Sequence, residues 1–293
     1  MEDISIKDIS INDEYRVIKE FKCHGKRMVT VRIGNVAHVM SLEDWQKVYG
    51  RNPQRKWKAE VDWNRFVLRI GCNKKDVSKN GRDFMLTRQQ NIFLAKKTFT
   101  ELVFNTAYIE GCNVTFPQTQ TIIDGAIVSG ISVDDIQTVL NLRDGWKYVI
   151  NSVDATLTLE YICKINEYVS RNESLEWGVL RKGTVGVGDF MPSIPIKENV
   201  LKEIQRIKGI NSPIDRALEY FAYACKQQLF WDGNKRTSTM VASKILIENG
   251  EGILTIGKDN AEEFNVTLNN WYLKNELQPL KDCLRKCIRT LEI

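Results

Sequence analysis

Apolar and polar residues follow two different periods along this chain. Between Tyr15 and about Gly50, β-branched and aromatic residues alternate with polar ones, and two glycine-containing turn signals interrupt the alternation. Such alternation puts apolar side chains on one face of a strand, so it predicts a small antiparallel sheet. After Thr87 the apolar residues recur every three or four positions, which is the period of amphipathic helices.

The helical pattern begins with a capping box, in which Thr87 is followed by Gln90. Apolar residues then form one stripe as far as Ile109, and Gly111 is placed to end the helix. The stretch 180–195, LRKGTVGVGDFMPSIP, mixes β-forming residues with glycines and predicts a short exposed hairpin. Further helices are expected over residues 133–149, 159–169, 197–207, 213–230, 235–248 and 261–273.

These patterns divide the chain into four parts. Residues 1–60 are expected to form a small basic, β-rich module of α+β character, in which Leu42–Tyr49 is a short helix. Residues 61–90 are a linker or surface connection, 91–275 a helical domain and 276–293 a C-terminal helix. The predicted fold class is therefore mainly α, with a short β-hairpin and a β-rich N-terminal module.

The net charge of +5 is unevenly distributed. Residues 1–97 carry 21 Lys and Arg against 12 Asp and Glu, whereas the rest of the chain carries 21 against 25. A basic module can recruit nucleic acid or an acidic protein surface, although surface lysines that only keep a domain soluble explain the excess equally well. Trp57, Trp63 and Phe66 lie among these basic residues, an arrangement that suits either nucleotide stacking or buried aromatic side chains.

Hydrophobic residues make up 43% of the chain, but no apolar run approaches the length of a membrane span, and the sequence begins with the polar stretch MEDISIKDIS. We therefore expect a cytoplasmic protein without membrane association. Seven scattered cysteines without a C-x-x-C pair predict reduced thiols. Cys283 and Cys287 share one helix face, either as half a metal site or as two buried, unreactive thiols.

The candidate chemistry lies in Asp232-Gly233-Asn234-Lys235-Arg236, between two predicted helices. Glycine and asparagine tolerate positive φ, so successive backbone N–H groups there can point into one concavity and bind an anion. The start of the next helix adds its dipole, Arg236 adds a forked donor, and Asp232 can hold a magnesium ion that bridges phosphates. An ordinary turn with Asp232 or Asn234 as N-cap is the structural alternative.

Residues 230–237, FWDGNKRT, resemble the Fic family signature H-x-F-x-[DE]-G-N-[GK]-R at Phe230 and at every position from Asp232 to Arg236. Upstream, Thr106, Glu110 and Gly111 resemble the [ST]-x-x-x-E-[GN] inhibitory helix of some Fic proteins. The hairpin stretch resembles the family's flap, which holds a target protein by strand pairing. Its candidate contact residues are Thr184, Val185, Gly186, Val187 and Gly188.

The resemblance implies a helical core that binds ATP with Mg²⁺ and transfers AMP to a hydroxyl side chain of a target protein bound along the flap. By that match Asp232 holds the metal. Gly233, Asn234 and Lys235 form an anion hole, and Arg236 grips the phosphates. Glu110 is expected near the γ-phosphate, where it disfavours a productive nucleotide pose.

The sequence departs from this pattern at three positions. Gln228 stands where the family has its catalytic histidine, and glutamine is no useful base near neutral pH. Thr239 stands where many members have an arginine, so Glu110 is expected to lack its usual ion-pair partner. Lys235 stands in place of the commoner glycine and resembles the loop of the Doc toxins, which transfer a phosphoryl group.

Several functions are compatible with these departures. The first is a Fic-type protein that binds a nucleotide but is catalytically impaired. The alternatives are an active, Doc-like phosphotransferase, whose base comes from elsewhere, and a non-catalytic module that binds nucleic acid or protein. Gln228 is also compatible with an introduced substitution that traps an inactive form.

Overall fold

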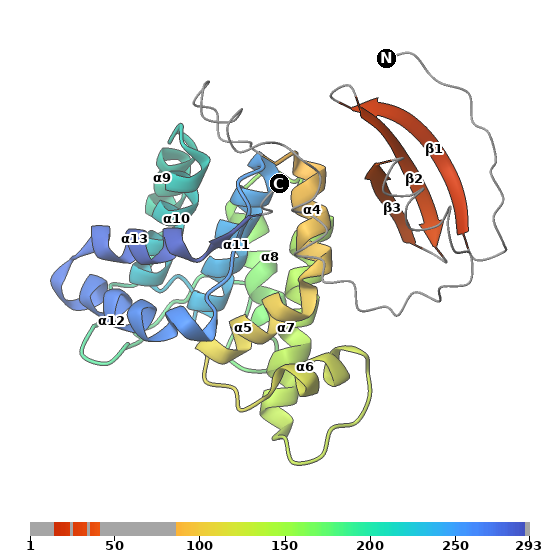
Figure 1. Ribbon diagram of the computed structural model, residues 1–293. Helices are drawn as coiled ribbons and strands as arrows, with labels where there is room; N and C mark the ends of the chain where they lie inside the picture. Colours follow the sequence, from red (N-terminus) through yellow and green to blue (C-terminus); the bar gives the residue numbers. More distant parts are fainter. Residues whose placement is uncertain (1–14, 24–25, 34–35, 42–85, 291–293) are drawn as a thin grey trace. The chain divides into compact units, whose positions relative to one another are not determined.

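The computed structural model describes residues 15–23, 26–33, 36–41 and 86–290 (Figure 1). The contacts divide the chain into two compact units. The strands near the N-terminus belong to the first unit, and all the described helices belong to the second.

The first unit contains a three-stranded antiparallel sheet in the order β1-β2-β3. Its strands are β1 (Tyr15–Cys23), β2 (Lys26–Ile33) and β3 (Val36–Ser41). The helix expected over residues 42–49 and the aromatic residues among the basic ones lie outside the described residues.

The described part of the second unit is mainly helical, as the apolar periodicity predicts. All six helices expected between residues 133 and 273 are present. Helix α10 ends three residues early, because Gln228 adopts a left-handed conformation with φ of 47°. The helices are α4 (Arg88–Lys97), α5 (Phe99–Ile109), α6 (Phe116–Ile123), α7 (Val133–Asn151), α8 (Leu159–Val169), α9 (Lys197–Lys208), α10 (Pro213–Gln227), α11 (Asn234–Asn249), α12 (Lys258–Lys274) and α13 (Leu277–Lys286).

Three features differ from the predicted elements. The stripe from Thr87 to Ile109 is divided at Thr98, whose hydroxyl and N–H both bond the Leu94 carbonyl oxygen. Helix α6 begins at a second capping box that the apolar pattern alone did not mark. The C-terminal stretch is not all helix, since β5 (Ile288–Arg289) follows α13 and pairs with β4 (Ile253–Leu254).

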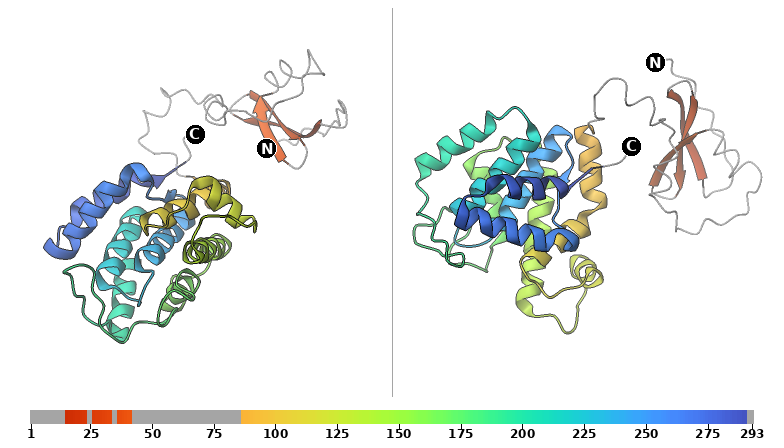
Figure 2. Two further views of the ribbon diagram at one scale, coloured as in Figure 1. Left: turned by 90° about the horizontal axis from the view of Figure 1, so that it is seen from below. Right: turned by 60° about the vertical axis from the view of Figure 1, so that its left-hand side comes forward.

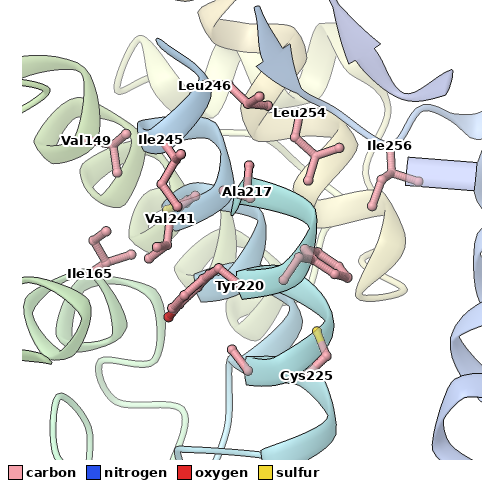
Figure 3. Close-up of a cluster of buried hydrophobic side chains, with 14 of the residues drawn as sticks. Val149, Ile165, Ala217, Tyr220, Cys225, Val241, Ile245, Leu246, Leu254 and Ile256 are labelled. Atoms are coloured by element: carbon pink, nitrogen blue, oxygen red, sulfur yellow. The ribbon is translucent and has the colours of Figure 1, made fainter. Parts of the chain in front are cut away.

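Helix α11 is the centre of the helical unit and packs against α4, α7, α8 and α10 (Figures 1 and 2). Its residues from Arg236 to Ile247 are all buried, so this helix is covered on every side and not only along one apolar stripe. Figure 3 shows Val241, Ile245 and Leu246 of α11 among side chains from α7, α8 and α10. Helix α11 is therefore packed on all sides along most of its length.

None of the described helices combines the length and the hydropathy that crossing a bilayer requires. The cysteines at 112, 163, 225, 283 and 287 are free thiols. Cys283 and Cys287 are both buried.

Candidate functional site

The loop between α10 and α11 is built from two left-handed residues. Gln228 ends α10 with φ of 47°, and Gly233 precedes α11 with φ of 72°. A side chain at position 233 has no room, because a Cβ there would lie 2.2 Å from Ser170 Oγ. Glycine is required here both by the backbone conformation and by the approach of α8.

The side chain of Asn234 holds the loop closed. Its Oδ1 accepts from the Phe230 N–H at 2.9 Å, and its Nδ2 donates to the Phe230 carbonyl oxygen at 2.9 Å. Nδ2 also donates to Gln228 Oε1 at 2.9 Å. Phe230 is 1% exposed and anchors the loop in the core. The side-chain amide of Asn234 is thus used within the loop. The backbone N–H of Asn234 takes no part in these bonds and stays available to a ligand.

Helix α8 supports the loop from outside. Asn166 Nδ2 and Ser170 Oγ both donate to the Asp232 carbonyl oxygen, at 2.9 and 3.0 Å. Asn166 Nδ2 also lies 3.2 Å from Thr237 Oγ1 in the first turn of α11. Both supporting residues are fully buried, so they fix the loop backbone in a dry environment.

The first turn of α11 presents an anion-binding arrangement. Among the described residues, none accepts a hydrogen bond from the backbone N–H of Asn234, Lys235 or Arg236. The Gly233 N–H is taken by the Asp232 carboxylate at 2.5 Å. Unpaired N–H groups at a helix N-terminus, together with the helix dipole, favour a bound anion such as phosphate.

Arg236 lies buried among three carboxylates and is 3% exposed. It donates to Glu173 Oε2 at 2.5 Å and to Asp232 Oδ2 at 3.0 Å, and its Nε lies 3.7 Å from Glu110 Oε2. These neighbours raise the pKa of Arg236 against the opposing effect of burial, so the guanidinium stays charged. Its contacts with the protein organise the loop, and a grip on phosphates stays a prediction from the sequence.

Glu110 follows α5 and is brought beside the loop. Its Oε1 lies 3.6 Å from Lys235 Nζ, and Lys235 Nζ donates to the Ile109 carbonyl oxygen at 3.1 Å. The usual arginine partner at position 239 is absent, as the sequence indicated, but Lys235 and Arg236 lie beside Glu110 in its place. Thr239 is buried and bonds the Lys235 carbonyl oxygen.

The carboxyl group of Glu110 is poorly solvated. Buried Oε1 accepts no hydrogen bond from the described residues, because its cation neighbours lie beyond hydrogen-bond distance. Burial raises the pKa of Glu110 above its ordinary value of 4.5, although Lys235 and Arg236 act in the opposite direction. An ionised Glu110 is thus held at some cost next to the candidate anion site.

Two other residues of the expected inhibitory motif have structural contacts. Thr106 Oγ1 donates to the Leu102 carbonyl oxygen and accepts from Trp146 Nε1 inside the core. Gly111 has φ of 84° and ends the α5 segment as the sequence predicted. Neither residue lines the cavity described next.

A cavity of about 380 Å³ opens in front of the loop. Glu110, Gln228, Asp232, Asn234 and Lys235 all line it, so most candidate residues from two distant parts of the sequence meet there. The flap residues 185–188 line it as well, whereas Thr184, Gly233 and Arg236 lie outside its wall.

The flap differs from the expected hairpin. The described residues from 180 to 195 contain one bridged pair, in which Val187 and Phe190 exchange two backbone hydrogen bonds of 2.9 and 3.1 Å. Three glycines and two prolines in this stretch disfavour a longer ladder. The backbone groups of Val185 are left without a strand partner among the described residues.

Sequence reasoning missed the wall that α12 contributes. Asn265, Leu268, Asn269 and Tyr272 line the cavity from one helix face, and Trp231 lines it from the loop. Phe190 of the flap stacks on Tyr272 with ring centroids 5.4 Å apart and planes at 6°. The spacing of 265, 268, 269 and 272 is a helical stripe, but half of it is polar, so it carried no apolar signal.

Gln228, at the position of the histidine in the Fic signature, lines the cavity from the end of α10. It is 7% exposed, its Nε2 donates to the Cys225 carbonyl oxygen at 2.6 Å, and its Oε1 accepts from Asn234. A neutral amide with both ends engaged fixes the loop but takes no proton from a ligand. None of the described residues that line the cavity is a histidine.

Comparison with known proteins shows which family this chain resembles. Residues 156–246 match the Fic/DOC family model. Protein adenylyltransferase Fic of Drosophila willistoni is 26% identical over 208 residues, and that of Drosophila virilis is 25% identical over the same length. The alignments span 66% of this chain and 41% and 42% of those proteins, respectively.

Solved Fic structures share the fold of the helical unit. Fic-1 from C. elegans superposes with a TM-score of 0.59 at 21% identity, over 66% of this chain and 60% of that one. A Fic domain-containing signalling protein from Bacteroides thetaiotaomicron gives 0.57 at 17% identity, over 69% and 87%. The helical unit of this chain has the fold of the solved Fic proteins, residues 156–246 match the Fic/DOC family model, and the sequence is similar to those of the Fic protein adenylyltransferases.

Proposed function

We propose that the cavity binds ATP and that it is an adenylyltransferase-type active site. This site is impaired because Gln228 replaces the histidine that would act as the base. The observation that carries the proposal is that three N–H groups at the start of α11 have no acceptor among the described residues, while both ends of the nearby Gln228 amide are hydrogen-bonded. The first feature suits nucleotide phosphates, and the second removes the proton acceptor. The cavity volume falls within the range of small-molecule sites.

The phosphates are assigned to the N–H groups of Asn234, Lys235 and Arg236, with Lys235 Nζ as an additional positive charge. The adenine is assigned to the α12 wall. Asn265 and Asn269 line the cavity, and no described residue pairs with their amides. An amide offers one donor and one acceptor side, which matches the edge of adenine.

Asp232 is the residue assigned to Mg²⁺. Its side chain is 48% exposed and lines the cavity, and each oxygen keeps a lone pair after bonding Gly233 or Arg236. No group of three potential metal ligands occurs among the described residues. One accessible carboxylate fits a magnesium ion whose other ligands are phosphate oxygens and water, and the ion would neutralise phosphate charge when bound.

The proposed reaction forms a bond between a target hydroxyl oxygen and the α-phosphorus of ATP. The bond from that phosphorus to the bridging oxygen breaks, and pyrophosphate leaves. The hydroxyl proton needs an acceptor, and the Gln228 amide provides none. Burial also raises the pKa of Tyr272, so its phenol stays neutral and is no base at neutral pH.

The target protein is assigned to the flap. Val185 is half-buried and Gly186 exposed, and no described residue takes a backbone hydrogen bond from either, so these two residues have room to pair with an extended segment in the manner of strand addition. Nucleic acid or an acidic protein at the N-terminal module, and a cytoplasmic location, stay predictions from the sequence.

The test is protein labelling in cell lysate with ATP that carries the label at the α- or the γ-phosphorus. Gln228→His is expected to raise α-label incorporation about 10²–10⁴-fold over the chain as given, because general-base catalysis contributes about that much. Gln228→Asn serves as the matched control, since it changes the side chain without adding a base.

Other labelling patterns would count against the proposal. Incorporation of the γ-label by the unchanged chain would favour the phosphotransferase alternative, in which Lys235 has a Doc-like role. Equal α-labelling by the unchanged chain and Gln228→His would mean that the base lies elsewhere.

A further inference from the structure

Arg181 is a buried cation that the candidate site does not explain. It is 1% exposed, and no carboxylate pairs with it among the described residues. Its guanidinium instead donates to five backbone carbonyl oxygens. These belong to Gln228 at 2.5 Å, Gly183 at 2.5 Å, Ser193 at 2.6 Å, and Pro192 and Gln227 at 3.3 Å.

These acceptors come from two segments that both border the cavity. Gly183, Pro192 and Ser193 flank residues 184–191 on both sides, so one guanidinium closes the base of that loop. Gln227 and Gln228 supply the last carbonyl groups of α10, which lack intrahelical partners and carry the negative end of the helix dipole. A planar fork with five N–H groups can serve several such acceptors at once, whereas a lysine ammonium has three.

Two further contacts join the same segments. The backbone N–H of Arg181 donates to the Leu229 carbonyl oxygen at 3.0 Å. The Trp231 ring packs on Gly183 so closely that a Cβ there would lie 2.4 Å from it. Residues 184–191 are therefore tied at their base to the loop that carries Gln228, and near their C-terminal end to Tyr272 through Phe190.

We propose that Arg181 is a positioning residue that sets the conformation of residues 184–191 relative to the loop 228–236. The guanidinium touches no ligand position in the cavity and acts through the backbone of both segments. Its effect on nucleotide binding rests on the function proposed above, but its effect on the two segments does not. Removal of the Arg181 guanidinium should therefore make the backbone of both segments more mobile, even without a nucleotide.

The first measurement is hydrogen exchange by mass spectrometry on the full chain without ligand, comparing the unchanged protein with Arg181→Lys. Arg216→Lys is the matched control, because Arg216 also forks onto a backbone carbonyl, that of Ile210, but lines neither segment. We expect amides of residues 184–191 and 228–233 to exchange at least about tenfold faster in Arg181→Lys, since one lost charge-assisted hydrogen bond is worth at least that. Arg216→Lys should leave both segments unchanged.

Two results would overturn the assignment. Unchanged exchange in residues 184–191 would mean that the fork does not hold the flap. Equally faster exchange throughout α7, α8 and α11 would mean that Arg181 only stabilises the whole unit. Arg181→Met, which also removes the charge, should enlarge the local effect and keep its pattern.

The second measurement is calorimetric titration with ATP and Mg²⁺ on the same variants. We expect weaker binding by Arg181→Lys and unchanged binding by Arg216→Lys. If the unchanged chain binds no ATP while the exchange pattern appears as expected, the proposed function fails and the positioning role stands. If ATP binds equally well to all three proteins despite faster exchange, the positioning role does not extend to the site.

Discussion

Two segments border the cavity, and they are built in opposite ways. The loop 228–236 is largely buried, is closed by Asn234 and is supported by Asn166 of α8 and by Ser170 directly after that helix. Residues 184–191 have a single bridged pair, and Met191 is 65% exposed. The first segment is suited to a ligand of fixed shape such as a polyphosphate, and the second to partners whose backbone alone must match.

The largest effect that would sharpen this contrast is expected from Arg236→Met. Removing the guanidinium leaves Glu110, Glu173 and Asp232 without their shared cation, and breaking a buried ion pair on one side costs about 3–5 kcal/mol. Urea unfolding should show this loss. Arg206→Met is the control, because Arg206 also meets two carboxylates but is half exposed, so its loss should cost about 0–1 kcal/mol. Equal losses would show that the loop is no more preorganised than the surface.

A matched pair of glycines compares the two segments directly. Gly233 and Gly188 both have positive φ, of 72° and 56°. A Cβ at Gly188 meets nothing within 4 Å, whereas at Gly233 it collides with Ser170 Oγ. We expect Gly188→Ala to cost about 1–2 kcal/mol from backbone strain alone and Gly233→Ala about 3 kcal/mol or more, because overpacking adds to the strain. Thermal unfolding of both variants measures the difference, and similar costs would contradict the account of the loop.

The smallest effect is expected at Glu110, where the loop meets α5. Glu110→Gln should tighten ATP binding about tenfold, or about 1.4 kcal/mol, since a carboxylate beside the phosphates is removed. The pKa of Glu110 is raised by burial, so lowering the pH protonates it in the unchanged chain. ATP affinity of the unchanged chain should therefore rise toward that of the variant as pH falls. Calorimetry at several pH values would contradict this if both proteins showed the same pH dependence.

The same pKa direction predicts how stability varies with pH. A carboxyl group whose pKa is raised by folding contributes stability below its ordinary pKa of 4.5, and that contribution is lost as pH rises through the folded value. The unchanged chain should therefore lose stability relative to Glu110→Gln over this range. Denaturant unfolding of both proteins at several pH values measures the difference, and a constant difference would mean that Glu110 keeps its ordinary pKa.

Local signals predicted local structure well. The capping box at Thr87 and Gln90 forms as expected, and α8 has the predicted bounds. The division at Thr98 escaped prediction because the apolar stripe continues across it. Periodicity records which residues face the core and not where a backbone bends.

The site was predictable where its residues are adjacent in sequence and less so where the fold assembles them. Asp232, Asn234, Lys235 and the distant Glu110 meet as the motifs indicated. The pairing of Glu110 with Lys235 and Arg236 was not predicted, because the approach of α5 to Lys235 is a tertiary contact. Arg181 and the α12 wall carry no local signal, since their roles depend on carbonyl groups and a cavity that exist only after folding.

The most direct test of the central claim is to titrate isotope-labelled protein with ATP and Mg²⁺ and to follow the backbone amide resonances by NMR. The account predicts that the largest shifts fall on Asn234, Lys235 and Arg236, whose N–H groups would bond the phosphates. Smaller shifts should appear on α12 at Asn265 and Asn269. Saturable binding without shifts at the start of α11, or no binding at all, would contradict the assignment of this loop as a nucleotide-phosphate site.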